Sequence, residues 1–105
     1  YGDIVMEKKP QALVLDGRDN VATLLSDAKA SDTVLLKGRE GTVTAEEDIP
    51  FGHKISLRAI RIGEDIMKYG HKIGVATTAI GPGEWVHLHN MTSAVDLTFK
   101  KRMES

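Results

Sequence analysis

The pattern of apolar and polar positions predicts a small protein built of short strands. The phrase Ile-x-x-Gly occurs three times, and each copy leads into a short run that can form a strand: Ile49–Gly52, Ile60–Gly63 and Ile80–Gly83. The isoleucine would end one strand facing the core, and the glycine would turn the chain because it adopts positive φ without steric cost. Residues 28–31 are a weaker copy, with Ser31 in the glycine place. The repeat predicts a tightly wound β-structure that brings the histidine-bearing strands together.

Further strands are expected outside the repeat. Short apolar or β-branched runs bounded by polar loop residues are typical of strands, and they occur at Gln11–Leu15, Thr33–Leu36 and Thr42–Thr44. The last two would form a hairpin across a glycine-containing turn. Residues 53–62 alternate, with Ile55, Leu57 and Ala59 on one side, which predicts a half-buried strand.

A single short helix is expected over residues 21–28. Four apolar residues fall at i, i+3, i+4 and i+7, namely Val21, Leu24, Leu25 and Ala28. Asp19 or Asn20 stands where a helix N-cap is wanted. A helix of two to three turns is marginal in isolation, so it would have to pack on the sheet. The expected fold class is therefore mainly β with one short helix.

Composition and charge narrow the class of protein. The 105 residues are enough for one domain, and 41% hydrophobic and 28% charged residues are ordinary for a soluble globular protein. The net charge of −1 argues against a nucleic-acid-binding module. The chain has no cysteine, which excludes disulfides and zinc–thiolate sites and fits a reducing compartment. It shows neither a membrane span nor a signal peptide, so we expect a cytoplasmic protein without a membrane or nucleic-acid partner.

The run from Glu84 to Asn90 is the first candidate for chemistry. As a strand it would have two faces: one carries Trp85, His87 and His89, and the other, core-facing side carries Val86 and Leu88. Imidazoles two residues apart on a strand are about 7 Å from each other, so they can converge on one divalent ion. Asn90 would add an oxygen ligand. The alternative is two exposed surface histidines beside a tryptophan, and the sequence assigns no third ligand.

A second candidate is a basic pocket. His53 and Lys54 follow one tight turn, and His71 and Lys72 follow another. Together with Lys68, these residues could bind the carboxylate of an anionic substrate, since ammonium groups make charge-assisted hydrogen bonds to carboxylates. The alternative is a set of solvated turn residues. Tyr69, before Gly70, would act as an acid or base, or else as a packing cap on the turn.

Four phrases taken together resemble a known family. They are Asp19–Ala22, Asp48–Lys54, Lys68–Gly74 and Gly83–Asn90. In this order they are similar to the N-terminal domain of altronate and galactarate dehydratases, an SAF-type domain with a β-clip fold. The resemblance covers residues 12–90. It leaves residues 1–11 as an N-terminal extension or edge strand and residues 91–105 as a C-terminal tail, whose basic end favours a complete small protein.

The resemblance implies a function and a set of site residues. It implies a lyase component that helps to remove water from a sugar acid, as a separate small subunit or as the N-terminal domain of a larger catalytic chain. A divalent metal, iron or manganese, would be shared with that chain. With the basic-pocket argument, the assigned roles are catalysis for His53, Lys68 and Tyr69; substrate binding for Lys54, Gly70, Lys72 and Asn90; and metal binding for His87 and His89.

Three other functions stay open at this point. SAF-type domains occur in unrelated settings, so the chain could be a non-catalytic module that binds a carbohydrate acid or a partner protein, or a lid that only holds an assembly together. Sulfolactate sulfo-lyase has a similar small subunit, which makes a sulfo-lyase component a further alternative.

Overall fold

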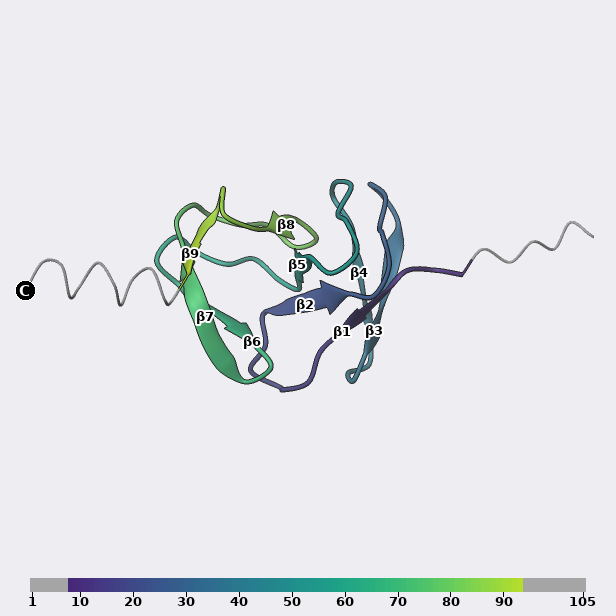
Figure 1. Ribbon diagram of the computed structural model, residues 1–105, viewed down its shortest axis with the longest axis horizontal. Helices are drawn as coiled ribbons and strands as arrows, with labels where there is room; N and C mark the ends of the chain where they lie inside the picture. Colours follow the sequence, from purple (N-terminus) through teal and green to yellow (C-terminus); the bar gives the residue numbers. More distant parts are fainter. Residues whose placement is uncertain (1–7, 94–105) are drawn as a thin grey trace, which may run out of the picture.

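The computed structural model describes residues 8–93, which form nine short strands in two sheets and, within this range, no helix (Figure 1). The strands are β1 (Gln11–Leu13), β2 (Val21–Leu24), β3 (Thr33–Lys37), β4 (Thr42–Thr44), β5 (Lys54–Ser56), β6 (Asp65–Lys68), β7 (His71–Ala76), β8 (Trp85–Val86) and β9 (Met91–Ser93). The larger sheet has the order β4-β3-β1-β2-β5-β8, and the smaller has the order β6-β7-β9. Neighbouring strands are antiparallel except β1 and β3, which are parallel.

The core consists of two buried clusters that meet at β2. Ala22 and Leu24 belong to the cluster inside the large sheet, whereas Val21 belongs to the cluster around β6 and β7. All three side chains are fully buried. In Figure 1, β2 and β5 lie between the small sheet at one end and β1, β3 and β4 at the other. The two sheets therefore form one small β domain, and the expected fold class is confirmed apart from the helix.

The four copies of the repeated phrase form the same turn, and we call residues 28–31, 49–52, 60–63 and 80–83 the repeat turns. Gly52, Gly63 and Gly83 have φ of 84°, 84° and 81°. Ser31, in the weaker copy, has φ of 76°, so it adopts the glycine conformation despite its Cβ. The first residue of each turn is buried.

Each repeat turn exchanges two backbone hydrogen bonds with a residue distant in sequence. At the second turn, the Gly52 N–H donates to the Leu24 carbonyl, and the Leu24 N–H donates to the His53 carbonyl, both at 2.9 Å. The other three turns make the same pair of bonds with Ala45, Ala76 and Ser56. These bonds satisfy backbone groups that the short strands leave free.

The repeat turns also associate in pairs. Ala28 and Ile49 form one isolated bridge, and Ile60 and Ile80 form the other. Carboxylates reinforce the first pair, because Asp27 accepts the backbone N–H of Phe51 at 2.8 Å and Asp48 accepts that of Ala30 at 2.9 Å. The sequence predicted the turns, but their pairing appears only in the structure.

The prediction of a helix over residues 21–28 is wrong, because this segment forms β2 and the loop after it. β2 is hydrogen-bonded on both edges, to β1 and to β5. Leu25, assigned to the buried helical face, is 41% exposed. The polar residues expected to cap the helix bind elsewhere: Asn20 accepts the backbone N–H of Met67 at 2.7 Å and donates to the carbonyl of Asp65 at 2.8 Å. Sheet pairing on both sides outweighs a short helical period.

Two other expectations need correction. The strand expected over residues 53–62 is limited to β5, and Ser56, placed on its wet face, is fully buried. Its hydroxyl donates to the carbonyl of Arg58 at 2.6 Å, which turns the chain away from the sheet. Residues 91–93, assigned to the tail, form β9 and pair with β7. Residues 1–7 and 94–105 lie outside the described part of the chain. Within residues 8–93, no helix is long and apolar enough to span a membrane.

Replacing Gly83 by alanine should destabilise the domain more than the same change at Gly63. Both glycines have positive φ, which costs an L-residue about 1–2 kcal/mol. A Cβ at Gly83 would also lie 1.9 Å from the Thr44 carbonyl oxygen, whereas a Cβ at Gly63 would meet no atom within 4 Å. We expect Gly83→Ala to lower the free energy of unfolding by about 1–3 kcal/mol more than Gly63→Ala, as measured by urea denaturation. Equal losses would show that the turn does not pack against β4.

Candidate functional site

Four aromatic rings gather where β5 and β8 lie side by side, and we call His53, Trp85, His87 and His89 the ring cluster. The β5–β8 register places Ile55 opposite Trp85, so His53 before β5 comes close to the residues around β8. Ring centroids are 5.0 Å apart for His53 and His87, and 5.3 Å apart for His53 and Trp85. Trp85 stacks on His87 at 5.6 Å and meets the edge of His89 at 5.8 Å. The structure thus places His53, which the sequence assigned to the basic pocket, beside the histidine pair His87 and His89.

The tryptophan also makes a directed contact with a histidine. Nε1–H of Trp85 donates a hydrogen bond to Nδ1 of His53 at 3.2 Å. Trp85 itself is held by its backbone, whose N–H donates to Glu47 at 3.1 Å and whose carbonyl accepts from Asn90 at 2.8 Å. The indole therefore occupies a fixed place at the centre of the ring cluster.

The strand expected over residues 84–90 stops after two residues. β8 covers Trp85–Val86, and residues 87–90 form a turn in which the N–H groups of Asn90 and Met91 donate to the His87 carbonyl, both at 3.0 Å. Leu88, expected in the core, is 71% exposed. The cause is the buried amide of Asn90, which accepts the His87 N–H at 2.9 Å and so closes the turn. The expected strand spacing of the two imidazoles therefore does not apply.

Burial and neighbouring basic side chains lower the pKa values of Lys54 and His87. Burial lowers the pKa of Lys54, and the positive charge of Lys68 lowers it further. The pKa of His87 is likewise lowered by burial and then by the charges of His53, Lys54 and His89. Groups that repel one another in this way are stabilised by an anion placed between them. The cluster is therefore suited to a carboxylate ligand.

The β6–β7 hairpin carries three more of the predicted site residues. Lys68 ends β6, and its Nζ lies 5.2 Å from the centroid of the Tyr69 ring. Tyr69 and Gly70 form the tip, with φ of 55° and 79°. The Gly70 N–H donates to the buried Asp19 carboxylate at 2.8 Å, so its backbone anchors the hairpin to the loop before β2. Within this hairpin, Lys68 is close enough to Lys54 for its charge to lower the pKa of Lys54.

The remaining predicted residues have other contacts. Lys72 lies on the exposed side of the same hairpin, with its Nζ 3.3 Å from Asp65. Asn90 uses both ends of its amide on the backbone of the β8 turn. Asn90 therefore stabilises the turn after β8 that carries His87 and His89. Lys72 lies on the surface of the hairpin.

The described residues do not by themselves complete a metal site. A divalent ion held by protein side chains usually needs at least three of them. Within residues 8–93, no group of three or more histidine, cysteine, aspartate or glutamate side chains could hold a metal ion. His87 and His89 both contact Trp85, but they offer at most two nitrogen ligands. Any ion at this place would need ligands in addition to the side chains of residues 8–93.

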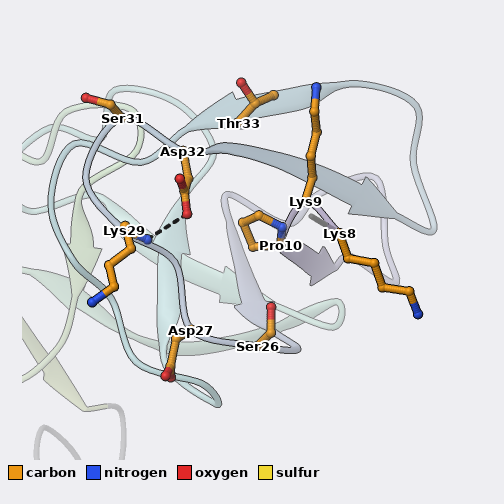
Figure 2. Close-up of a pocket in the computed structure, with 9 residues that line it drawn as sticks. All are labelled: Lys8, Lys9, Pro10, Ser26, Asp27, Lys29, Ser31, Asp32 and Thr33. Atoms are coloured by element: carbon orange, nitrogen blue, oxygen red, sulfur yellow. Dashed lines mark hydrogen bonds between the residues drawn. The ribbon is translucent and has the colours of Figure 1, made fainter. Parts of the chain in front are cut away.

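Two hollows lie near the first repeat turn. One, of about 230 Å³, reaches Trp85 and is also lined by Ile49, Pro50 and polar residues in or just before the first two repeat turns. The other, of about 580 Å³, is lined by Lys8, Lys9 and Lys29 among others. Figure 2 shows that the three ammonium groups of this second hollow point in different directions, so they do not converge on an anion. The ring cluster is the better candidate for a functional site.

A comparison with protein families identifies the domain. Residues 10–94 match the model of the altronate/galactarate dehydratase SAF domain. The chain belongs to this family. The match includes all nine strands and the whole ring cluster, so the resemblance seen in the four sequence phrases is confirmed.

Three curated relatives are similar to this chain over different shares of their own length. Altronate dehydratase of Escherichia coli (strain K12) is 38% identical over 80 residues, which are 76% of this chain and 16% of the relative. Altronate dehydratase of Bacillus subtilis (strain 168) is 37% identical over 73 residues, 70% of this chain and 14% of the relative. (2R)-sulfolactate sulfo-lyase subunit alpha of Paracoccus pantotrophus is 42% identical over 48 residues, 46% of this chain and 72% of the relative. The chain thus spans about a sixth of the length of these altronate dehydratases.

Trp85 is the site residue whose role the sequence did not reveal. It was placed on the same face as the histidines, but no role was assigned to it. Its position as the single tryptophan of the chain, between a turn glycine and His87, was the available signal. Its hydrogen bond to His53 could not be read from the sequence, because the two residues are 32 positions apart.

Replacing Lys54 by methionine should raise the pKa of His87. The Lys54 charge lowers that pKa, and methionine keeps the apolar stem while removing the charge. Lys37→Met is the matched control, because Lys37 lies at the end of β3 and is not among the groups that shift His87. A titration of the His87 ring protons by NMR should show an upward shift in the first variant and none in the second. An unchanged pKa of His87 in Lys54→Met would show that the Lys54 charge does not act on His87.

Proposed function

We propose that this SAF domain is the small subunit or N-terminal domain of a sugar-acid dehydratase of the altronate/galactarate type. In this proposal it completes the active site of a larger catalytic chain. The observation that carries the proposal is the convergence of the ring cluster with Lys54, in a domain whose family is that of these dehydratases. The cytoplasmic location expected from the composition stays a prediction.

The proposed reaction assigns a task to each group. Loss of a β-hydroxyl from a hydroxy acid requires a base at the α-carbon, stabilisation of the resulting enediolate and an acid for the leaving hydroxide. His87 suits the base, because its lowered pKa favours the neutral imidazole at neutral pH. Lys54 and Lys68 provide positive charge for the substrate carboxylate. In this proposal, Tyr69 supplies a phenol beside Lys68 for proton transfer.

A larger partner is part of the proposal for two reasons. The chain spans only 16% and 14% of the two altronate dehydratases, and the sulfo-lyase relative is named as a subunit. The donors for a metal ion are also incomplete within residues 8–93. An iron or manganese ion would therefore be held mainly by the partner chain, with His89 as an additional ligand, because an imidazole that accepts the α-proton has no lone pair left for the ion. When bound, such an ion would polarise the carboxylate and hydroxyl oxygens of the substrate.

A second candidate function follows from the sulfo-lyase relative. That protein is 42% identical over 48 residues, which are 72% of its own length, so most of it is similar to part of this domain. The same basic cluster would then bind the carboxylate of a sulfonated hydroxy acid, and the partner chain would determine which group leaves. Assaying altronate, galactarate and sulfolactate side by side with the partner present would separate the two functions.

Reconstitution with the large chain tests the proposed function. The purified domain alone should show no turnover of altronate or galactarate, and addition of the large dehydratase chain from the same source should restore it. His87→Ala should then lower kcat by roughly 10²–10⁴-fold, the usual contribution of a general base. Where the two parts form one polypeptide, the same substitution applies to the full-length enzyme.

His71→Ala is the matched control for this experiment. His71 begins β7, outside the ring cluster, and should leave turnover unchanged. Full activity of His87→Ala and His89→Ala would exclude the histidines from catalysis. Binding of sugar acids by the isolated domain, followed through Trp85 fluorescence and without effect on partner turnover, would instead support a non-catalytic binding module.

Metal binding should depend on the partner. Two imidazoles are too few for tight binding, so Mn²⁺ titrated into the isolated domain should bind weakly in calorimetry. The complex with the large chain should bind Mn²⁺ more tightly, and His89→Ala should weaken that binding. Equal Mn²⁺ affinity of the wild-type and substituted complexes would exclude His89 as a ligand.

A further inference from the structure

The hydrogen bond between Trp85 and His53 determines where a neutral His53 carries its proton. An indole Nε1–H is only a donor, so Nδ1 of His53 must be the acceptor at 3.2 Å. A neutral imidazole has one N–H and one free lone pair. Because the lone pair of Nδ1 is used in this bond, the proton of a neutral His53 lies on Nε2.

We infer that Trp85 is a positioning residue that holds His53 in the Nε2–H tautomer, so that neutral His53 acts as a hydrogen-bond donor beside His87 as the acceptor. The two imidazoles are 5.0 Å apart between centroids, with 61° between their planes. Two chemically identical side chains thereby obtain opposite tasks. The catalytic part of this inference rests on the proposed function, whereas the tautomer does not.

The geometry shows why the indole can impose this state. Its backbone is fixed by β5 on one side and by Asn90 and Glu47 on the other. Its ring packs against the large-sheet core cluster and stacks on His87 with 15° between the planes. The direction of the indole N–H is thus set by contacts that do not involve His53.

The difference in roles suits an elimination. The enediolate needs a hydrogen-bond donor, while the α-proton needs an acceptor. A histidine free to exchange tautomers would present the donor for only part of the time. Trp85 would remove this ambiguity without touching the substrate.

The tautomer can be measured directly by NMR on the ¹⁵N-labelled 105-residue chain. At a pH above the titration of its imidazoles, long-range ¹H–¹⁵N correlations should show His53 with a protonated Nε2 and an unprotonated Nδ1. In Trp85→Phe, which keeps an aromatic ring but lacks the N–H, the Nδ1 and Nε2 shifts of His53 should move toward each other. His71, in the β6–β7 hairpin, is the internal control and should keep its shifts.

A reciprocal variant covers the case in which Trp85→Phe does not fold. In His53→Ala, the indole N–H of Trp85 loses its acceptor, so its proton resonance should move upfield. A wild-type His53 protonated on Nδ1, or an indole resonance that is unchanged in His53→Ala, would overturn the inference. Because these measurements use the free chain without substrate or partner, failure of the tautomer and failure of the proposed function are read separately.

Discussion

Backbone hydrogen bonding at the repeat turns is the constraint on which the rest of this structure depends. The strands are two to six residues long, too short to satisfy their own backbone groups in regular ladders alone. Each repeat turn contributes two bonds to a distant residue, and it can do so because its fourth residue takes positive φ. The turns therefore act as part of the sheets, and the two core clusters form around their buried first residues.

The functional site follows from the same constraint. The turn that ends in Gly52 delivers His53 to the start of β5, and the turn that ends in Gly83 delivers Trp85 to β8. Pairing of β5 with β8 then places His53 beside Trp85 and His87. The rings meet because two equivalent turns feed neighbouring strands. The site would thus be lost with the turns, even if every ring were kept.

Side chains that bond to backbone groups complete the arrangement. Asn20 joins the small sheet to β2, Asp19 holds the tip of the β6–β7 hairpin, and Asn90 closes the turn beneath the ring cluster. All three are buried polar residues with satisfied partners. Such bonds are costly to leave half made, so they specify one arrangement of the loops. The same polar loops that looked like caps and ligands in the sequence are therefore structural links between sheets.

The sequence by itself determined the repeat turns, including the glycine-like conformation of Ser31, because positive φ is a local property of each short phrase. It also determined the family, through four phrases in a fixed order. It did not determine that residues 21–24 form a strand, since their pairing on both edges involves residues distant in the chain. Nor did it determine that Trp85 bonds to His53, or that Asn90 ends β8 and exposes Leu88. Those outcomes depend on side chains meeting across strands, and only the tertiary structure decides which ones meet.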